Sequence, residues 1–202
     1  MEVLERAREL EREGVDVIHL EVGEPDFDVP LAVKEATKKA LDQGLTHYTH
    51  SLGDLELREA ICRHYEKTYG IYIKPEQVVV TSGTSPAMML VFSAFLERGQ
   101  EVILSDPGYS CYPNFINFLG GVPARVPVYE KDGFQPRAEA IRERIRDQTR
   151  AILINSPSNP TGNLLSEENM KAIAGLGPYI ISDEIYHGLV YEGKEHSILE
   201  FT

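Results

Sequence analysis

The sequence is poor in cysteine and in long apolar runs, and each shortage excludes a class of protein. The two cysteines, Cys62 and Cys111, are too few and too far apart for the disulfide framework of a small secreted domain. No uncharged apolar stretch approaches the roughly 18 residues that indicate a membrane span. The opening segment MEVLERARELERE is acidic and amphipathic, unlike an export signal. These features predict a cytoplasmic protein that has no membrane partner.

Positive charge is also scarce. Lys and Arg number 20 against 32 Asp and Glu, which gives a net charge of −12. A phosphate backbone requires a positive surface, so we expect no nucleic-acid partner. The arginines that cluster in sequence alternate with acidic residues, as on a solvated helix face; they are Arg137, Arg142, Arg144 and Arg146.

Strand-like and helical patterns alternate along all 202 residues, which is typical of parallel βαβ units and predicts an α/β fold. The predicted strands are residues 17–20, 77–80, 101–104, 151–154 and 179–181, with an extended segment at 124–129. The predicted helices are residues 3–10, 30–44, 54–69, 86–96 and 138–145, one that ends near Gly120 and one that begins after Ser166. The sequence shows no internal repeat or linker.

Polar, glycine- and proline-rich segments follow four of the predicted strands. They are residues 81–85, 106–109, 155–162 and 183–184. Because the carboxyl ends of parallel strands lie along one edge of a sheet, these segments should converge on a single crevice. The sequence therefore predicts a ligand site at that edge.

The first of these segments, Thr81-Ser82-Gly83-Thr84-Ser85, directly precedes Pro86 at a predicted helix start. Free backbone N–H groups and the positive end of a helix bind phosphate well. The segment lacks the G-x-G-x-x-G and G-x-x-x-x-G-K-[ST] spacings, which disfavours a nicotinamide cofactor or a nucleoside triphosphate. A serine-capped helix with no ligand fits the same residues.

Two further residues stand where a planar ligand would be held. Tyr109 follows Pro107-Gly108 at a strand end, where its ring would cover such a ligand or belong to the core. The rigid turn from Ser156 to Gly162 would aim the Asn159 amide inward, although a simple chain reversal has the same pattern.

Asp183 ends an apolar strand, where a carboxylate is costly unless it meets a cation or strong donors. A protonated pyridine nitrogen would be such a partner. An ordinary strand-end acid is one alternative, and a carboxylate pair or metal site with Glu184 is another. No cysteine or carboxylate completes a site around His47 and His50, so we expect no metal.

Taken together and in order, six segments resemble class I/II aminotransferases of pyridoxal-phosphate (PLP) fold type I. They are Gly23-Glu24-Pro25-Asp26-Phe27, Tyr48 with Gly53 and residues 57–61, residues 81–85, Pro107-Gly108-Tyr109, residues 159–162, and residues 182–186. The resemblance covers nearly the whole chain. It implies a three-layer α/β/α fold with a mainly parallel sheet, in which residues 1–27 belong with a small domain and residues 28–202 form part of the PLP-binding large domain.

The resemblance also implies roles for individual residues, with pyridoxal 5'-phosphate as cofactor and amino acids and 2-oxo acids as substrates. The phosphate would be held by Gly83, Thr84 and Ser85, and the ring would stack on Tyr109. Asp183 would pair with the ring nitrogen, and Asn159 and Tyr186 would bind the phenolic oxygen. Gly23 and Asn159 would contact the substrate, and Tyr48 would reach the phosphate of the neighbouring subunit in a homodimer.

One family element has no counterpart in the chain. The aldimine lysine of the family lies in a Ser-x-Ser-Lys-like segment downstream of the Asp-Glu-x-Tyr motif, and the only lysine after Asp183 is Lys194, in a polar, hairpin-like stretch. We therefore expect a fragment that has no catalytic lysine and is inactive by itself. A carbon-sulfur lyase shares every motif, and a non-catalytic PLP-binding regulatory domain remains a further alternative; a nucleotide-binding domain comes last.

Overall fold

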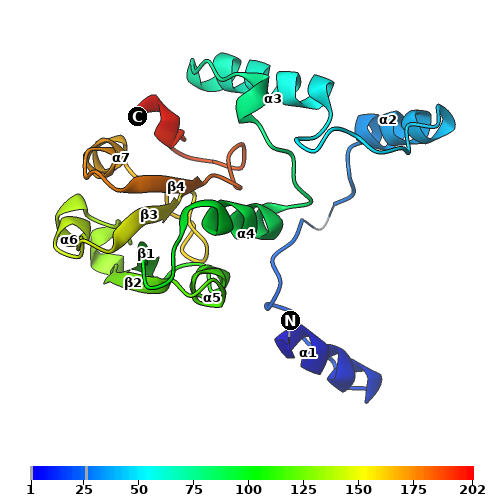
Figure 1. The fold of residues 1–202 in the computed structure, drawn as a ribbon. Helices are drawn as coiled ribbons and strands as arrows, with labels where there is room; N and C mark the ends of the chain where they lie inside the picture. The colour runs from blue at the N-terminus through cyan, green and yellow to red at the C-terminus, as the bar shows by residue number, and fades with distance from the viewer. Residues whose placement is uncertain (1, 26) are drawn as a thin grey trace. The chain divides into compact units, whose positions relative to one another are not determined.

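The computed structural model describes residues 2–25 and 27–202, which divide into two compact units, residues 1–48 and residues 49–202 (Figure 1). The first unit contains α1 (Glu2–Arg12) and α2 (Leu31–Asp42), as predicted. Met1, and Asp26 of the resembling Gly23–Phe27 segment, lie outside the described residues. No helix in the part of the chain that the structure describes is long and apolar enough to cross a membrane.

The strand predicted at residues 17–20 is wrong. This segment pairs with no strand among the described residues, and Ile18 and Leu20 are 85% and 89% exposed. The apolar residues Val17, Ile18 and Leu20 fit a strand, but a strand also needs a neighbour that satisfies its backbone N–H and C=O groups.

The second unit contains a sheet and its helices. The strands are β1 (Glu101–Asp106), β2 (Val122–Pro127), β3 (Thr149–Asn155) and β4 (Tyr179–Asp183). The helices are α3 (Leu55–Tyr69), α4 (Thr84–Phe95), α5 (Cys111–Phe118), α6 (Ala138–Arg142) and α7 (Glu167–Ala174), and the 3-10 turns are η1 (Pro75–Gln77), η2 (Glu130–Asp132) and η3 (Ile198–Glu200). The predicted strands at 101–104, 151–154 and 179–181 are confirmed, and the segment at 124–129 lies mostly in β2.

One more predicted strand is wrong, and two predicted helices are present but begin or end at other residues than expected. The strand predicted at 77–80 is instead the 3-10 turn η1 followed by unpaired extended backbone, in which Val80 N–H donates to the Leu52 carbonyl at 2.9 Å. Helix α4 begins at Thr84, before Pro86, because Gly83 adopts a φ of 127° that favours glycine. Helix α6 stops at Arg142 because the chain tightens into a turn in which Arg144 N–H donates to the Ile141 carbonyl.

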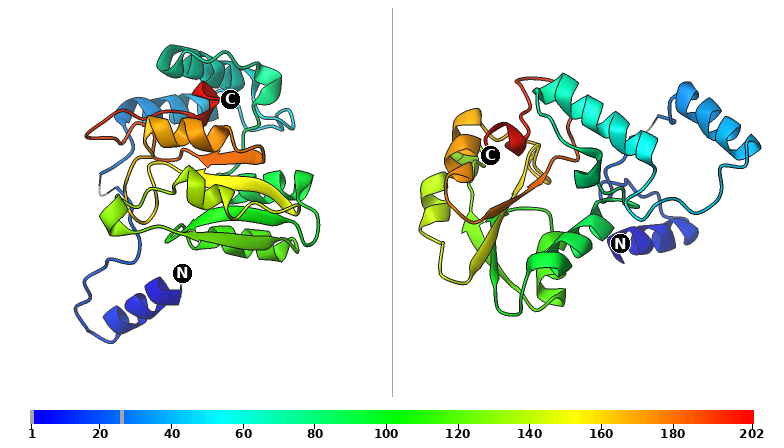
Figure 2. Two further views of the ribbon diagram at one scale, coloured as in Figure 1. Left: turned by 90° about the vertical axis from the view of Figure 1, so that its left-hand side faces the viewer. Right: turned by 45° about the horizontal axis from the view of Figure 1, so that its top comes forward.

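The four strands are all parallel and lie in the order β2-β1-β3-β4 (Figure 2). From β1 the chain passes through α5 to β2 on one side, whereas from β3 it passes through α7 to β4 on the other. The direction of winding therefore reverses between β1 and β3. In open α/β sheets, ligands bind outside the carboxyl ends of the strands at such a switch point.

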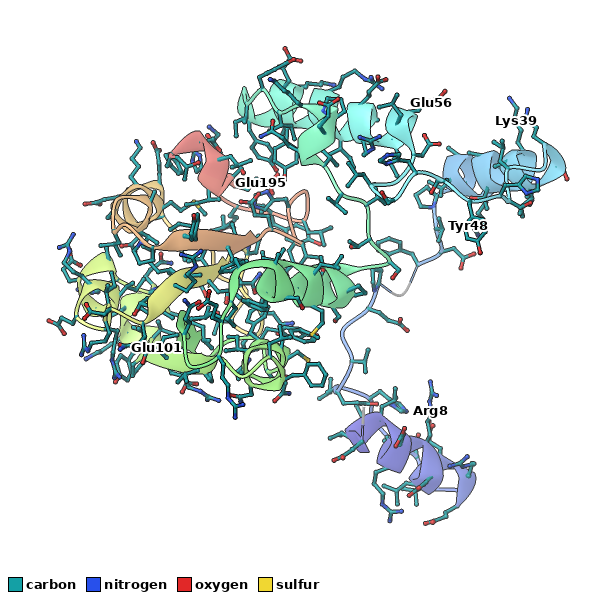
Figure 3. The ribbon with its side chains drawn as sticks, viewed as in Figure 1. Arg8, Lys39, Tyr48, Glu56, Glu101 and Glu195 are labelled. Atoms are coloured by element: carbon teal, nitrogen blue, oxygen red, sulfur yellow. The ribbon has the colours of Figure 1, made fainter. Side chains whose placement is uncertain are left out.

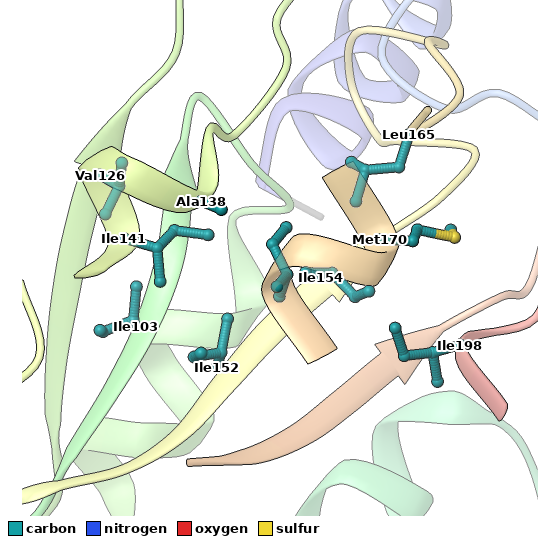
Figure 4. Close-up of a cluster of buried hydrophobic side chains, with 10 residues drawn as sticks. Ile103, Val126, Ala138, Ile141, Ile152, Ile154, Leu165, Met170 and Ile198 are labelled. Carbon is teal, nitrogen blue, oxygen red and sulfur yellow. The ribbon is translucent and has the colours of Figure 1, made fainter. Parts of the chain in front are cut away.

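Each face of the sheet has its own buried cluster, because neighbouring residues on a strand point to opposite faces. Leu104 and Leu153 pack with Phe92 of α4 and Ile116 of α5. On the other face, the side chains of Ile103, Ile152 and Ile154 pack with those of α6 and α7 (Figure 4). Each fully buried side chain of this size stabilises the fold by about 1.5–3 kcal/mol. The predicted three-layer α/β/α architecture is confirmed.

Candidate functional site

The loop before α4 leaves backbone N–H groups free at the start of a helix. Thr81 Oγ1 donates to the Gly83 carbonyl at 2.8 Å, and Ala87 N–H donates to the same oxygen at 3.3 Å. The N–H groups of Thr84 and Ser85 precede the first intrahelical bond and so have no partner within the helix. Open space surrounds Gly83, where a side chain would otherwise stand beside these donors. The backbone at this point is suited to a phosphate.

Thr84 and Asp183 line one pocket of about 460 Å³. Its walls come from α3, the loop before α4, α4 itself, and the end of β4. They include Tyr65, Thr81, Gly83, Met88 and Ile185. Ser85 is exposed and is not among the lining residues. The structure thus brings the helix start and the strand-end carboxylate together at the carboxyl edge of the sheet.

Asp183 is 7% exposed, and both of its carboxylate oxygens accept hydrogen bonds. The Tyr112 hydroxyl donates to Oδ2 at 2.7 Å, and Ile185 N–H donates to Oδ1 at 3.2 Å. Burial, together with the hydrogen bond to Asp183, raises the pKa of Tyr112 far above the ordinary value, so the hydroxyl remains a donor at neutral pH. Sequence reasoning missed Tyr112. The available signal was its position one helical turn after Tyr109.

Tyr109 lies beside this pair. Its ring meets the Tyr112 ring edge-on, with centroids 5.1 Å apart, and is partly buried. Interaction with the Cys111 side chain, together with burial, raises the pKa of Tyr109 to about 12. Both tyrosines are therefore neutral at physiological pH, and Tyr112 connects Tyr109 to Asp183.

Asn159 and Tyr186 are also brought together, because the Asn159 side-chain amide donates to the Tyr186 hydroxyl at 3.2 Å. Asn155 supports them: Oδ1 accepts from Asn159 N–H at 2.7 Å, and Nδ2 donates to the Asp183 carbonyl at 2.9 Å. Asn155 lies opposite Asp183 in the β3–β4 register. Sequence reasoning placed Asn155 at a strand end but gave it no role.

Glu184 is engaged away from Asp183. Its Oε1 accepts hydrogen bonds from the Ser182 and Ser197 hydroxyls at 2.7 and 3.2 Å, and from Ile198 N–H at 2.9 Å. These contacts tie the end of β4 to η3, and they give Glu184 a structural task in place of the pairing with Asp183 considered above. Over residues 2–25 and 27–202, no group of three His, Cys, Asp or Glu side chains is placed to hold a metal ion.

The sequence interpretation named three further residues, Gly23, Tyr48 and Lys194. Gly23 and Tyr48 belong to the N-terminal unit, and the Tyr48 side chain is fully exposed (Figure 3). Lys194 is exposed in the segment after β4. No lysine is among the described residues that line the pocket.

The fold and site define a doubly wound α/β domain that has a helix start with free backbone N–H groups, a buried carboxylate and several tyrosines at the carboxyl edge of its sheet. The chain belongs to the family "Aminotransferase class I and II", which matches residues 15–201. It is 44% identical over all of its length to (5-formylfuran-3-yl)methyl phosphate transaminase of Methanocaldococcus jannaschii, covering 52% of that protein. It is also 44% identical to a probable aspartate/prephenate aminotransferase of Thermus aquaticus, with 95% of this chain and 51% of the other covered.

Solved structures agree with these relatives. An aspartate aminotransferase from Thermus thermophilus with maleate superposes with a TM-score of 0.96 at 41% identity, covering 98% of this chain and 53% of the other. An alanine aminotransferase from Pyrococcus furiosus superposes with a TM-score of 0.95 at 37% identity, covering 100% and 53%. The chain therefore spans about half the length of the proteins it resembles.

Proposed function

We propose that the chain supplies the PLP-binding part of an aminotransferase that moves an amino group between an amino acid and a 2-oxo acid. The observation that carries this proposal is the pocket shared by Thr84 at the start of α4 and Asp183 at the end of β4. The relatives described above are named as transaminases or aminotransferases, which supports this activity over that of a carbon-sulfur lyase.

The residues present fit the cofactor. The free N–H groups of Thr84 and Ser85 would hold its phosphate, beside Gly83. Asp183 is buried and forms no ion pair with any described residue, so its negative charge has hydrogen-bond donors but no cation. A protonated ring nitrogen would be the missing positive partner.

PLP, when bound, supplies an electron sink for the reaction. The chain's own residues would orient the cofactor and hold protons. Asp183 would keep the proton on the ring nitrogen, with Tyr112 fixing the carboxylate. The Tyr186 hydroxyl accepts from Asn159, so its own hydrogen is free to be donated to the phenolic oxygen. The Tyr109 ring would pack against the face of the pyridine ring.

Other parts of the proposal concern the whole protein. Because no lysine is among the described residues of the pocket lining, we infer that the chain by itself binds PLP without turning over. Gly23 would contact the substrate, and the exposed Tyr48 would serve the phosphate of a second subunit in a homodimer. The free thiols of Cys62 and Cys111 support a cytoplasmic setting.

The test is the binding of pyridoxamine 5'-phosphate, which needs no lysine, measured by calorimetry. Asp183→Asn removes the charge with little change in shape, and we expect affinity to fall roughly 10- to 100-fold because a charge-assisted hydrogen bond is lost. Asp106→Asn is the matched control, since Asp106 also ends a strand but is about half exposed beside Arg125. Equal affinity of Asp183→Asn and the parent chain would contradict the proposal.

Turnover is tested with PLP, a panel of amino acids and 2-oxoglutarate. We expect no amino-group transfer beyond that of free PLP. Transfer well above that level, abolished by Lys194→Ala, would show that Lys194 is the catalytic lysine.

A further inference from the structure

His187 directly follows Tyr186, and both of its ring nitrogens are engaged. Nε2 lies 3.0 Å from the Ser156 carbonyl oxygen, and Nδ1 lies 2.6 Å from the Tyr69 hydroxyl. The side chain is 10% exposed. Its ring also packs against the Tyr69 ring, with centroids 5.7 Å apart. His187 is not among the residues that line the pocket.

The partners of His187 determine which nitrogen carries the hydrogen. A carbonyl oxygen only accepts, so Nε2 must be the donor to Ser156. In the neutral ring Nδ1 is then the acceptor, and the Tyr69 hydroxyl donates to it. The ring is thus held between the Ser156 carbonyl and the Tyr69 hydroxyl, which stand on different segments of the chain, and Glu184 Oε2 lies 3.8 Å from the same Nδ1.

These contacts join three segments. Tyr69 is the last residue of α3, and Ser156 follows β3. Ser156 is itself buried, and its N–H donates to the Asp183 carbonyl at 3.1 Å. His187 N–H donates to the Glu184 carbonyl at 3.0 Å and closes the turn after β4. The ring therefore fastens the turn that carries Tyr186 to the loop that leads to Asn159.

We propose that His187 is a positioning residue that holds the Tyr186 hydroxyl at the phenolic oxygen of the cofactor, an inference that rests on the proposed function. Tyr186 forms its hydrogen bond with Asn159 across the same two segments that His187 fastens together. An apolar ring would fill the same space, but neither nitrogen contact would remain. Loss of His187 would therefore weaken the contact between Tyr186 and the phenolic oxygen and leave the contacts to the phosphate unchanged.

The experiment compares two ligands: pyridoxamine 5'-phosphate and its 3-deoxy analogue, which lacks the phenolic oxygen. Affinities are measured by calorimetry for the parent chain, His187→Phe, His187→Gln and Tyr186→Phe, with His64→Phe as the control for losing an exposed histidine of the same aromatic cluster. Urea unfolding of each variant shows that it is folded. In the apo chain, ¹⁵N NMR of the imidazole reads out the expected Nε2–H tautomer.

We expect His187→Phe to lower the affinity for pyridoxamine 5'-phosphate about fivefold, as for one lost hydrogen bond. The affinity for the deoxy analogue should stay within about twofold of that of the parent chain. Tyr186→Phe should show the same selectivity, and the double variant should add little to either change. His187→Gln, whose amide can replace the Nε2 donor, should recover most of the affinity. If His187→Phe lowers the affinity for both ligands equally, or for neither, the inference about His187 is overturned and the proposed function stands. If the parent chain binds neither ligand, the inference and the proposed function are both overturned.

Discussion

Residues 49–202 and the N-terminal unit differ in what supports their helices. The first region buries apolar side chains in two clusters, one on each face of the sheet. Among the described residues of the N-terminal unit, Ala7 is the one buried hydrophobic side chain. Helices α1 and α2 there carry surface ion pairs such as Arg6–Glu9 and Lys38–Glu35. Such pairs contribute little, so tertiary burial dominates only in the sheet region.

The same difference explains which strand patterns became strands. Residues 151–154 and residues 17–20 are both strand-like in sequence, but only the first segment has paired neighbours, β1 and β4. Pairing satisfies the backbone and buries both faces of β3 at once. A strand-like segment of this chain therefore forms a strand where neighbouring strands can pair with it.

The sharpest test of this comparison replaces the same residue type in each region. Ile152 is 1% exposed in β3, so Ile152→Ala should lower the free energy of unfolding by about 2–5 kcal/mol through lost burial and the cavity left behind. Ile18→Ala, at a side chain that is 85% exposed, should change it by less than about 0.5 kcal/mol. Urea unfolding measures both. Similar losses would mean that the N-terminal unit also depends on buried side chains.

A smaller effect is expected from single hydroxyl groups. Tyr112→Phe leaves the buried Asp183 carboxylate with one donor fewer and should cost about 1–3 kcal/mol of unfolding free energy. Tyr48→Phe removes a hydroxyl from a fully exposed ring and should be close to neutral. If the Tyr112 variant is as stable as the parent chain, the Tyr112–Asp183 hydrogen bond contributes nothing net to the site.

A still smaller difference in unfolding free energy is expected between hydroxyl side chains at the helices of the two regions. The Ser166 side chain caps α7 by accepting from Asn169 N–H at 3.2 Å, and Ser166→Ala should cost about 1 kcal/mol in thermal or urea unfolding. Thr37 in α2 donates back to the Val33 carbonyl at 2.8 Å. Such bonds do not stabilise a helix, so Thr37→Ala should be neutral or slightly stabilising. A larger loss at Thr37 than at Ser166 would reverse the comparison.

The comparison can also be tested through the response of stability to pH. Burial, with the Glu195 carboxylate, raises the pKa of Tyr69 to about 12. Because its pKa is raised in the folded state, Tyr69 contributes stability that is fully present below the unfolded pKa near 10. This contribution to the free energy of unfolding is lost as pH rises toward 12. Stability should fall within that window, and less steeply in Tyr69→Phe, as followed by urea unfolding at each pH.

The N-terminal unit should respond in a different pH range. Hydrogen bonds with Glu11 and then Glu21 raise the pKa of His19 above 6.5. The stability that these hydrogen bonds contribute is fully present below pH 6.5, the unfolded pKa, and is lost as pH rises through the folded pKa of His19. In an NMR titration of the His19 ring, Glu11→Gln should lower the midpoint. An unchanged midpoint would show that the exposed contact does not persist in solution.

The local sequence pattern was sufficient to predict the strands of the sheet and the edge of the sheet at which the site lies. The apolar runs that became β1, β3 and β4 each end in a polar residue, and the carboxyl ends of parallel strands share one edge. Of the four polar segments expected in one crevice, residues 81–85 and 183–184 contribute to the lining of one pocket, whereas Tyr109 and Asn159 are not among the described residues that line it. The assignments of Asn159 and Tyr186 to the cofactor came from family resemblance, and the cofactor contacts themselves stay predictions.

The partners of these residues were not predictable, because they depend on distances between elements far apart in sequence. Tyr112 and Asp183 are 71 residues apart, and Tyr69 and His187 are 118 residues apart. No periodicity relates such positions. A tyrosine on a short helix is equally compatible with core packing and with a hydrogen bond to a buried carboxylate.

By itself, then, the sequence determined the α/β class, the strands β1, β3 and β4 with most of the helices of the sheet region, and the polar strand ends that mark the site. These depend on side-chain periodicity and on glycine and proline, which act over a few residues. The tertiary structure decided which strand-like segments pair, that Glu184 supports η3 and not Asp183, and that Tyr112 and His187 fasten the site. These depend on the packing of distant segments, because a hydrogen bond exists only where the fold brings its donor and acceptor within reach.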